Sequence, residues 1–418
     1  MSWTDEVFRK QFRMDKDQFL DVVDRCKRAY PGRYSNGIDN YKLAQIRGDA
    51  GSKSGSITME LKVAITLRLL AGASYLDMVW YGVAINTVAP VFKFTVLLMD
   101  IALPNLEFFN MPETEAQCEQ TAKEWSDIMR AKRHADLMPG TLLAGDGLVV
   151  HIEAPTAKDR EGLDLTVFRN RKGCYGLIVQ AFCDAHCRFR YWDVLWPGST
   201  PDITCYKQTR LYRMFLDGKI PNKFHMVLDE AYSSIGGDQH LCPYSKAQLQ
   251  SPNTNPQLYL RMKAFNNILS SQRITIERAF GMFVRKWGIF WRPLSAAFGI
   301  AFQCRLLRVC AKLHNMCIDY RLRKNQATAA GDEEEAAREP ADDRGRTGVL
   351  RWREYDDGDA PSDEAVREMM DNYARQGVQR ACRVDSAKRS GLRENIYDKG
   401  FRYDHRRDLD FTMHPTIR

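Results

Sequence analysis

Four acidic residues have the types and positions from which a metal site could be built. Each lies within or beside an apolar segment, and the four are Asp146, Asp202, Asp229 and Glu277. Oxygen ligands of this kind favour Mg²⁺ or Mn²⁺ over Zn²⁺. Carboxylates about 4 Å apart repel by roughly 4 kcal/mol per pair at an effective dielectric of about 20, and a divalent cation reverses that sign. Two such ions would stabilise the attacking and leaving oxygens of a phosphoryl displacement.

Asp146 interrupts the segment PGTLLAGDGLVVHIEAP, which is apolar, bounded by proline and predicted to be a strand. An acid in a buried apolar face is costly unless it is paired or binds a metal. Gly145 and Gly147 flank it and leave room for another group to approach the backbone. Strand alternation places Asp146 on one face with four apolar residues, Leu142, Ala144, Leu148 and Val150.

Asp229 and Glu230 follow a second predicted buried strand, FHMVL, at residues 224–228. Alternation puts Asp229 on the face of His225 and Val227, while Glu230 points the other way. Only one of the two acids can therefore face a given site, although both could also be ordinary surface residues.

Glu277 lies on a predicted helix beside a core stripe with spacings of four, three and four residues: Ile276, Phe280, Phe283 and Trp287. Gly281 stands one turn further on and opens space along the line of Arg273 and Glu277. A surface glutamate paired with a nearby arginine is the alternative reading, so Glu277 alone is weak support for a metal site.

Asp202, in WPGSTPDIT, also has two readings. Thr200 can cap a helix that begins at Pro201, and an acid in the first turn complements the helix dipole. Local physics does not separate that role from metal binding.

The elements that would position these acids form a mixed α/β pattern. We expect three strands between residues 139 and 197 with a hairpin at 184–187, a helix ended by Gly218, the strand at 224–228, and helices over 257–323. The predicted domains are a helical region over 1–135, an α/β domain over 136–323, and a tail over 324–418. The tail is low in apolar residues and is expected to be largely disordered, apart from a candidate helix at 362–382.

Residues 60–100 contain a candidate helix-turn-helix. The sequence predicts a helix to Ala71, a turn through Gly72, a short helix over 74–81, a break at Gly82 and a third helix from about residue 86. Ser74 and Asn86 are the predicted N-caps. Pro90 is awkward within the third helix, and a plain helical bundle fits equally well.

The net charge of +8 is unevenly distributed. Residues 325–360 hold eleven acids against five arginines, a local charge of −6, so the rest of the chain carries +14. A basic body suits a polyanion partner, although an ordinary basic enzyme has the same composition. Basic residues also gather in FRNRKG, where we predict phosphate contacts by Arg169, Arg171 and Lys172, with a solvated loop as the alternative.

The eleven cysteines follow no disulfide framework, which indicates free thiols in a reducing compartment. A zinc site is conceivable, but its spacing fits no common zinc module, and cysteines of a hairpin are the default; its ligands would be Cys183, His186, Cys187, His240 and Cys242. The charged N-terminus is not expected to be a signal peptide. The apolar stretch at 78–103 is interrupted by polar residues, so we expect buried helices there and no membrane association.

Over residues 60–323, a series of short motifs, in the same order, resembles the PIF/Harbinger transposases, which are DDE superfamily endonucleases. The phrases that carry this resemblance are LKVAITLRLLAGASYLDM, PGTLLAGDGLVVHI, FRNRKGCYGLIVQAFCDAHCRF, WPGSTPDI, LDEAY, QRITIERAFG and KLHNMCID. Each phrase is weak by itself, but the ordered set is specific. The family's GDxGYP pattern is LDEAYSS here, with an acid where a small residue is usual.

The resemblance implies an RNase H-like fold in which Asp146, Asp229 and Glu277 are catalytic and bind metal, with Asp202 as a further metal ligand. It implies cleavage of transposon ends and strand transfer into target DNA with Mg²⁺ or Mn²⁺, through two ions. Double-stranded DNA, a Myb-like DNA-binding protein and a homo-oligomer are the implied partners, and the nucleus is the implied location. A domesticated relative that binds DNA or protein without cutting is the alternative function. A hydrolase of small phosphoesters is a third.

Overall fold

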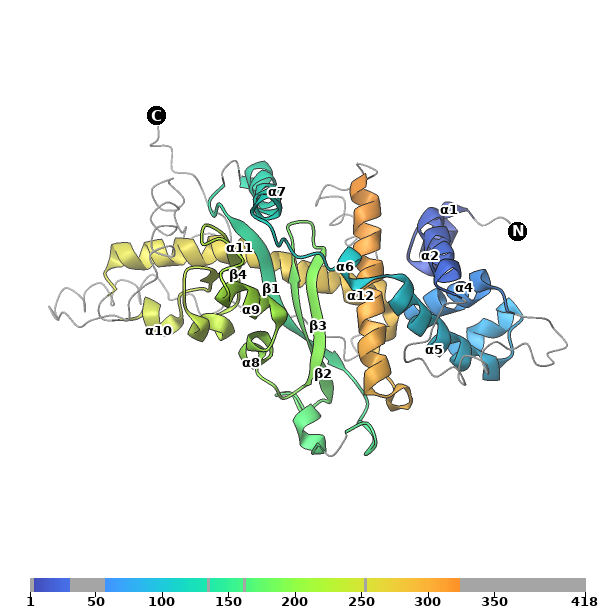
Figure 1. The fold of residues 1–418 in the computed structure, drawn as a ribbon. Coiled ribbons are helices and arrows are strands. Elements are labelled where there is room, and N and C mark those ends of the chain that lie inside the picture. The colour runs from blue at the N-terminus through green and yellow to red at the C-terminus, as the bar shows by residue number, and fades with distance from the viewer. Residues whose placement is uncertain (1–3, 31–56, 134–135, 161–162, 252–253, 324–418) are drawn as a thin grey trace.

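The computed structural model describes residues 4–30, 57–133, 136–160, 163–251 and 254–323 (Figure 1). Helices make up the part before the sheet: α1 (Asp5–Phe12), α2 (Lys16–Ala29), α4 (Met59–Leu70), the 3₁₀ helix η1 (Tyr75–Tyr81), α5 (Ile85–Ala102), α6 (Asn105–Phe108) and α7 (Glu115–Arg133). The tail and its candidate helix at 362–382 lie outside the described residues. The predicted division into three domains stays a prediction.

A five-stranded mixed sheet forms the centre of the molecule, with strand order β3-β2-β1-β4-β5. The strands are β1 (Thr141–His151), β2 (Gly176–Cys183), β3 (Phe189–Pro197), β4 (His225–Val227) and β5 (His240–Leu241). β1, β2 and β3 pair antiparallel, whereas β4 and β5 continue the sheet parallel to β1. Three antiparallel strands extended by two parallel ones give an RNase H-like sheet, so the predicted mixed α/β fold is confirmed.

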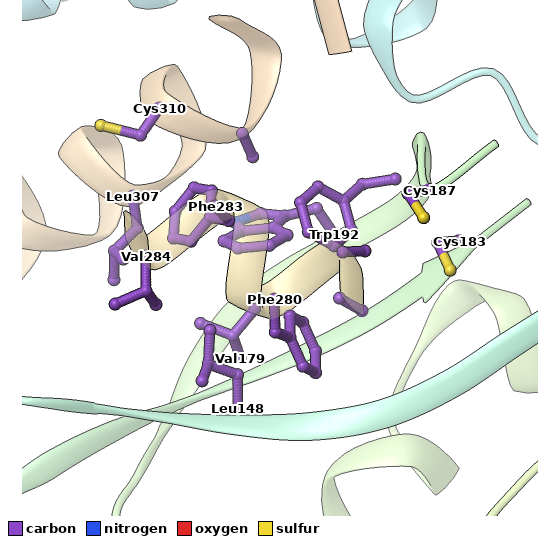
Figure 2. Packing of buried hydrophobic residues seen from close by; sticks show 14 of the residues in the cluster. Leu148, Val179, Cys183, Cys187, Trp192, Phe280, Phe283, Val284, Leu307 and Cys310 are labelled. Carbon is purple, nitrogen blue, oxygen red and sulfur yellow. The ribbon is translucent and has the colours of Figure 1, made fainter. Parts of the chain in front are cut away.

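One face of the sheet packs against α11 (Pro256–Lys286), a long helix that crosses it (Figure 1). Figure 2 shows Phe280 of this helix next to Val179 of β2 and Leu148 of β1, with Phe283 on the side toward Trp192 of β3. The predicted core stripe is confirmed, because all four of its residues are fully buried: Ile276, Phe280, Phe283 and Trp287. This stripe fixes the rotation of α11 and thereby the direction of Glu277 beside it.

A second apolar cluster joins the sheet to α8 (Asp202–Lys207), α9 (Arg210–Leu216) and the 3₁₀ helix η3 (Glu230–Ile235). Phe182 and Tyr206 pack in it. The segment over 201–218 is two helices and not the single predicted helix, because the Thr209 side chain caps α9 at residue 212. The predicted cap at Thr200 is also wrong, since α8 starts after Pro201.

The described part of the candidate helix-turn-helix follows the predicted outline closely. Ser74 caps η1 through its side chain, as expected, and Gly82 ends η1 with a positive φ of 72°. The third helix begins at Ile85 after Ala84, so Asn86 is not its N-cap. Pro90 falls within the first turns of α5 and is tolerated there. DNA binding by this region stays a prediction.

α5 is the one helix among the described residues that is long and apolar enough to cross a membrane, with a mean hydropathy of 1.5. It packs against α2, α4 and α12 (Ile300–Arg323), and a core helix passes the same test of length and composition. Asp100 at its end bonds to Arg308 and to the buried Lys312 of α12. Since α12 also contacts β3, these ion pairs tie the N-terminal helices to the sheet domain (Figure 1).

Candidate active site

Asp146 lies in the middle of β1, opposite Ala181 of β2. Its Oδ1 atom accepts a hydrogen bond from the backbone N–H of Gly147 at 2.8 Å. The Asp146 side chain is 21% exposed, although Ala144 and Leu148 on the same face of the strand are fully buried. The acid therefore sits at the edge of the core, with one side open to solvent.

Two residues of α11 reach Asp146 from the helix that covers this face. The Arg273 guanidinium lies 3.6 Å from Asp146 and 2.5 Å from Glu277, one turn further along the helix. The predicted line of Arg273 and Glu277 thus exists, and Arg273 extends it to the strand. The core stripe of α11 holds both residues at the sheet, because its own residues are buried on either side of them.

Asp202 approaches β1 at Gly147, the residue next to Asp146. A Cβ atom at Gly147 would overlap with the Asp202 carboxylate, so only glycine allows this approach. Gln180 of β2 stands opposite Gly147 and donates to Asp202 at 3.5 Å. The Tyr232 hydroxyl in turn donates to the Gln180 side-chain oxygen at 3.1 Å. A buried tyrosine and a buried glutamine thereby hold Asp202 beside Asp146.

Asp229 is the N-cap of η3, just after the strand β4, and its Oδ1 accepts from the backbone N–H of Glu230 at 2.6 Å. Asp229 is half-buried, whereas Glu230 is exposed. Electrostatic coupling links Asp229, and not Glu230, to the other acids. The choice of Asp229 over Glu230 as the acid that faces the site stays a prediction.

The electrostatics of the site are those of crowded carboxylates. Burial raises the pKa of Asp146 to about 7; Arg273 opposes this rise, while Asp229 and Asp202 add to it. Burial also raises the pKa of Asp202, with Arg171 opposing and Asp229 adding. The acids thus lie near enough to repel one another, and the nearby arginines do not remove the repulsion at Asp146.

The donor set fits a divalent metal by its chemistry, since a hard cation binds carboxylate oxygens and relieves the repulsion between them. In the described ranges, however, no three His, Cys, Asp or Glu side chains stand close enough together to hold an ion. Asp146 and Glu277 instead both contact Arg273. A metal site here would require these carboxylates to move toward a common point.

The predicted basic loop lies beside this site. Arg169, Arg171 and Lys172 are exposed, and the Asn170 side chain closes the turn by accepting from the backbone N–H groups of residues 172 and 174. Arg169 stacks over the Tyr175 ring at 5.3 Å. Arg171 opposes the rise in the pKa of Asp202, so its charge acts on the acids. Phosphate binding by the loop stays a prediction.

Residues 145–315 match the family model of the DDE superfamily endonucleases. This stretch of the chain is similar to the DDE superfamily endonucleases. It holds all four acids and the basic loop. Comparisons with curated proteins and with solved structures gave no match.

The alternative zinc site does not form among the described residues. Cys183 and Cys187 are buried in the β2–β3 hairpin, where Cys187 adopts a positive φ of 65°. His186 faces Glu124, and the His240 ring bonds to the Tyr206 hydroxyl. The described residues contain no cluster of His, Cys, Asp and Glu that could bind zinc. The cysteines therefore belong to the hairpin, as the default reading had it.

The sequence analysis did not predict three features around the acids. These are the roles of Gln180 and Tyr232 and the contact of Arg273 with Asp146. Gln180 lies in an apolar strand, and a polar residue within GLIVQAFC was a signal of the same kind as Asp146. Its role depends on the β1–β2 register, which places it opposite Gly147. Neither that register nor the packing angle of α11 can be read from residue spacing.

Proposed function

We propose that this protein is a Harbinger-type DDE transposase that cuts DNA at transposon ends and joins them to target DNA. The observation that carries the proposal is the gathering of Asp146, Asp202, Asp229 and Glu277 around the middle of β1. They come from four separate elements of an RNase H-like sheet domain, in a stretch that matches the DDE superfamily endonucleases.

The four acids have different tasks in this proposal. Asp146 and Asp229 would hold divalent cations from β1 and from the end of β4, Glu277 would contribute from α11, and Asp202 would complete the set. The cations, Mg²⁺ or Mn²⁺, would activate the attacking oxygen and stabilise the leaving one. No side chain is then needed as a nucleophile, because water or a 3′-hydroxyl attacks the phosphodiester.

The basic loop supports DNA as the substrate. Arg169, Arg171 and Lys172 would bind backbone phosphates close to the acids, because Arg171 already acts on the charge of Asp202. A small phosphoester has no use for an exposed basic loop of this kind. We also propose that the protein acts in the nucleus, with a Myb-like DNA-binding protein and further copies of itself as partners.

The test is cleavage of a DNA duplex that carries the inverted repeats flanking the genomic copy, in the presence of Mg²⁺ or Mn²⁺. The wild-type protein should cut at the repeat ends, whereas Asp146→Asn, Asp229→Asn and Glu277→Gln should abolish cutting, because each keeps its shape and loses its charge. Full cutting by the Asp146 or Asp229 variant would contradict the mechanism. Metal and DNA binding without any cutting by the wild type would favour the domesticated relative.

DNA binding by the loop needs its own test. Reversing the charge of Arg169, Arg171 and Lys172 to Glu should weaken DNA binding and flatten its dependence on salt, because fewer counterions are released. The matched control reverses three exposed basic residues elsewhere, Lys123, Arg130 and Lys219, with the same change in net charge. Equal weakening by both triple variants would show that only the overall charge matters.

A further inference from the structure

Arg273 occupies the space between two of the proposed metal ligands. Its guanidinium contacts Asp146 of β1 at 3.6 Å and Glu277 of its own helix at 2.5 Å, and its side chain is only 11% exposed. A largely buried positive charge therefore lies against two of the proposed metal ligands.

The charge balance gives this arginine a definite role. The Arg273 guanidinium is the positive charge that both Asp146 of β1 and Glu277 of α11 contact. A divalent cation would make the same favourable interactions with Asp146 and Glu277, and more strongly. Arg273 and the metal would thus compete for the same two carboxylates, because the guanidinium already contacts both of them.

We propose that Arg273 is an internal counter-ion that holds Asp146 and Glu277 in the metal-free protein and yields them to the metal. The inference rests on the proposed function, because it assumes that the metal binds at these acids. It makes Arg273 a positioning residue that lowers the affinity for metal while it stabilises the empty site.

The surroundings of Glu277 allow such an exchange. Gly281, one turn further along α11, has nothing within 4 Å of the place where a Cβ would stand. Glu277 can therefore change its rotamer on that side without meeting another side chain. The exchange needs only side-chain rotations, since the core stripe fixes the backbone of α11 at the sheet.

The experiment measures Mn²⁺ binding by thermal shift and by calorimetry, without DNA. For Arg273→Gln we expect a lower melting temperature without metal and a roughly tenfold tighter Mn²⁺ dissociation constant, about 1.4 kcal/mol. The metal-induced rise in melting temperature should therefore be larger than in the wild type. Should this variant fail to fold, Arg273→Lys keeps the charge but cannot span both carboxylates, and about threefold tighter binding is expected.

The matched control is Arg25→Gln. Arg25 also contacts two carboxylates on two elements, Asp21 of α2 and Glu107 of α6, away from the sheet. This variant should lose some stability and bind Mn²⁺ as the wild type does.

The outcomes separate the two proposals. Suppose that the Mn²⁺-induced rise in melting temperature is lost in Asp146→Asn but is unchanged or smaller in Arg273→Gln. This result would overturn the counter-ion role of Arg273 and leave the proposed function standing. The absence of any Mn²⁺ response in the wild type overturns both.

Discussion

Asp184 and Asp146 are both paired with arginine, and they differ in how well their charge is balanced. Asp184, in the β2–β3 hairpin, is fully buried and accepts from Arg188 and Arg190 at 2.7 Å each. Backbone N–H groups of His186 and Arg188 donate to it as well. Asp146 has one arginine at 3.6 Å, which it shares with Glu277.

The pKa values express this difference. Burial would raise the pKa of Asp184, but Arg188 and Arg190 outweigh it, so the pKa lies below its ordinary value. At Asp146 burial prevails over Arg273, and the pKa rises to about 7. Residue types and pairing are similar, yet one acid stabilises the fold and the other costs stability when charged. An acid that is partly buried, paired and still poorly balanced is therefore the better candidate for a functional residue.

The largest effect is expected from Asp184→Asn. It leaves two partly buried arginines without their shared carboxylate, and breaking a buried pair in this way costs about 3–5 kcal/mol. The folded pKa of Asp184 is lowered, so its contribution is present above the unfolded value and is lost as pH falls through the folded one. Urea unfolding at pH 7 should show the full loss of unfolding free energy. A stability close to that of the wild type would show that the Asp184 ion pairs contribute little to folding.

A smaller effect is expected from Gly147→Ala. The added Cβ would overlap with the Asp202 carboxylate and approach the Gln180 amide, and overpacking costs about 1–3 kcal/mol. Mn²⁺ binding should weaken with the loss of stability, because Asp202 must move away from Asp146. Gly281→Ala is the control for stability alone, since its Cβ meets nothing and a helical alanine should gain about 0.5–1 kcal/mol. Wild-type behaviour of Gly147→Ala in thermal unfolding and metal titration would contradict the placement of Asp202.

The smallest effect is expected from Tyr232→Phe. The variant removes the hydroxyl that donates to Gln180 and keeps the ring, so the loss should be about 1 kcal/mol. Gln180 would then orient Asp202 less firmly, and Mn²⁺ affinity should fall a few-fold. Chemical denaturation and calorimetry measure the two effects; an unchanged affinity would show that Tyr232 serves the core alone.

Much of this fold follows from the sequence because its signals are local. The alternation in β1 predicted that Asp146 lies among apolar residues, and the spacing in α11 predicted the buried stripe. Ser74 predicted where η1 begins. The errors are also local: Ala84, not Asn86, precedes α5, and Thr209 divides the segment expected to be one helix. Contacts between elements could not be predicted from the sequence. The contact of Arg273 with Asp146, for example, depends on the packing angle of α11.

The most direct measurement is the melting temperature of Asp146→Asn between pH 4 and pH 8, with and without Mn²⁺. The folded pKa of Asp146, about 7, exceeds its ordinary value, so the wild type loses stability as pH rises toward 7. At about 1.4 kcal/mol per pKa unit, the upper limit of this loss is roughly 4 kcal/mol, and asparagine avoids it. The metal-free variant should therefore be more stable than the wild type at pH 8, equal to it near pH 4, and insensitive to Mn²⁺. A metal-free variant that is less stable at pH 8 and still responds to Mn²⁺ would contradict the account.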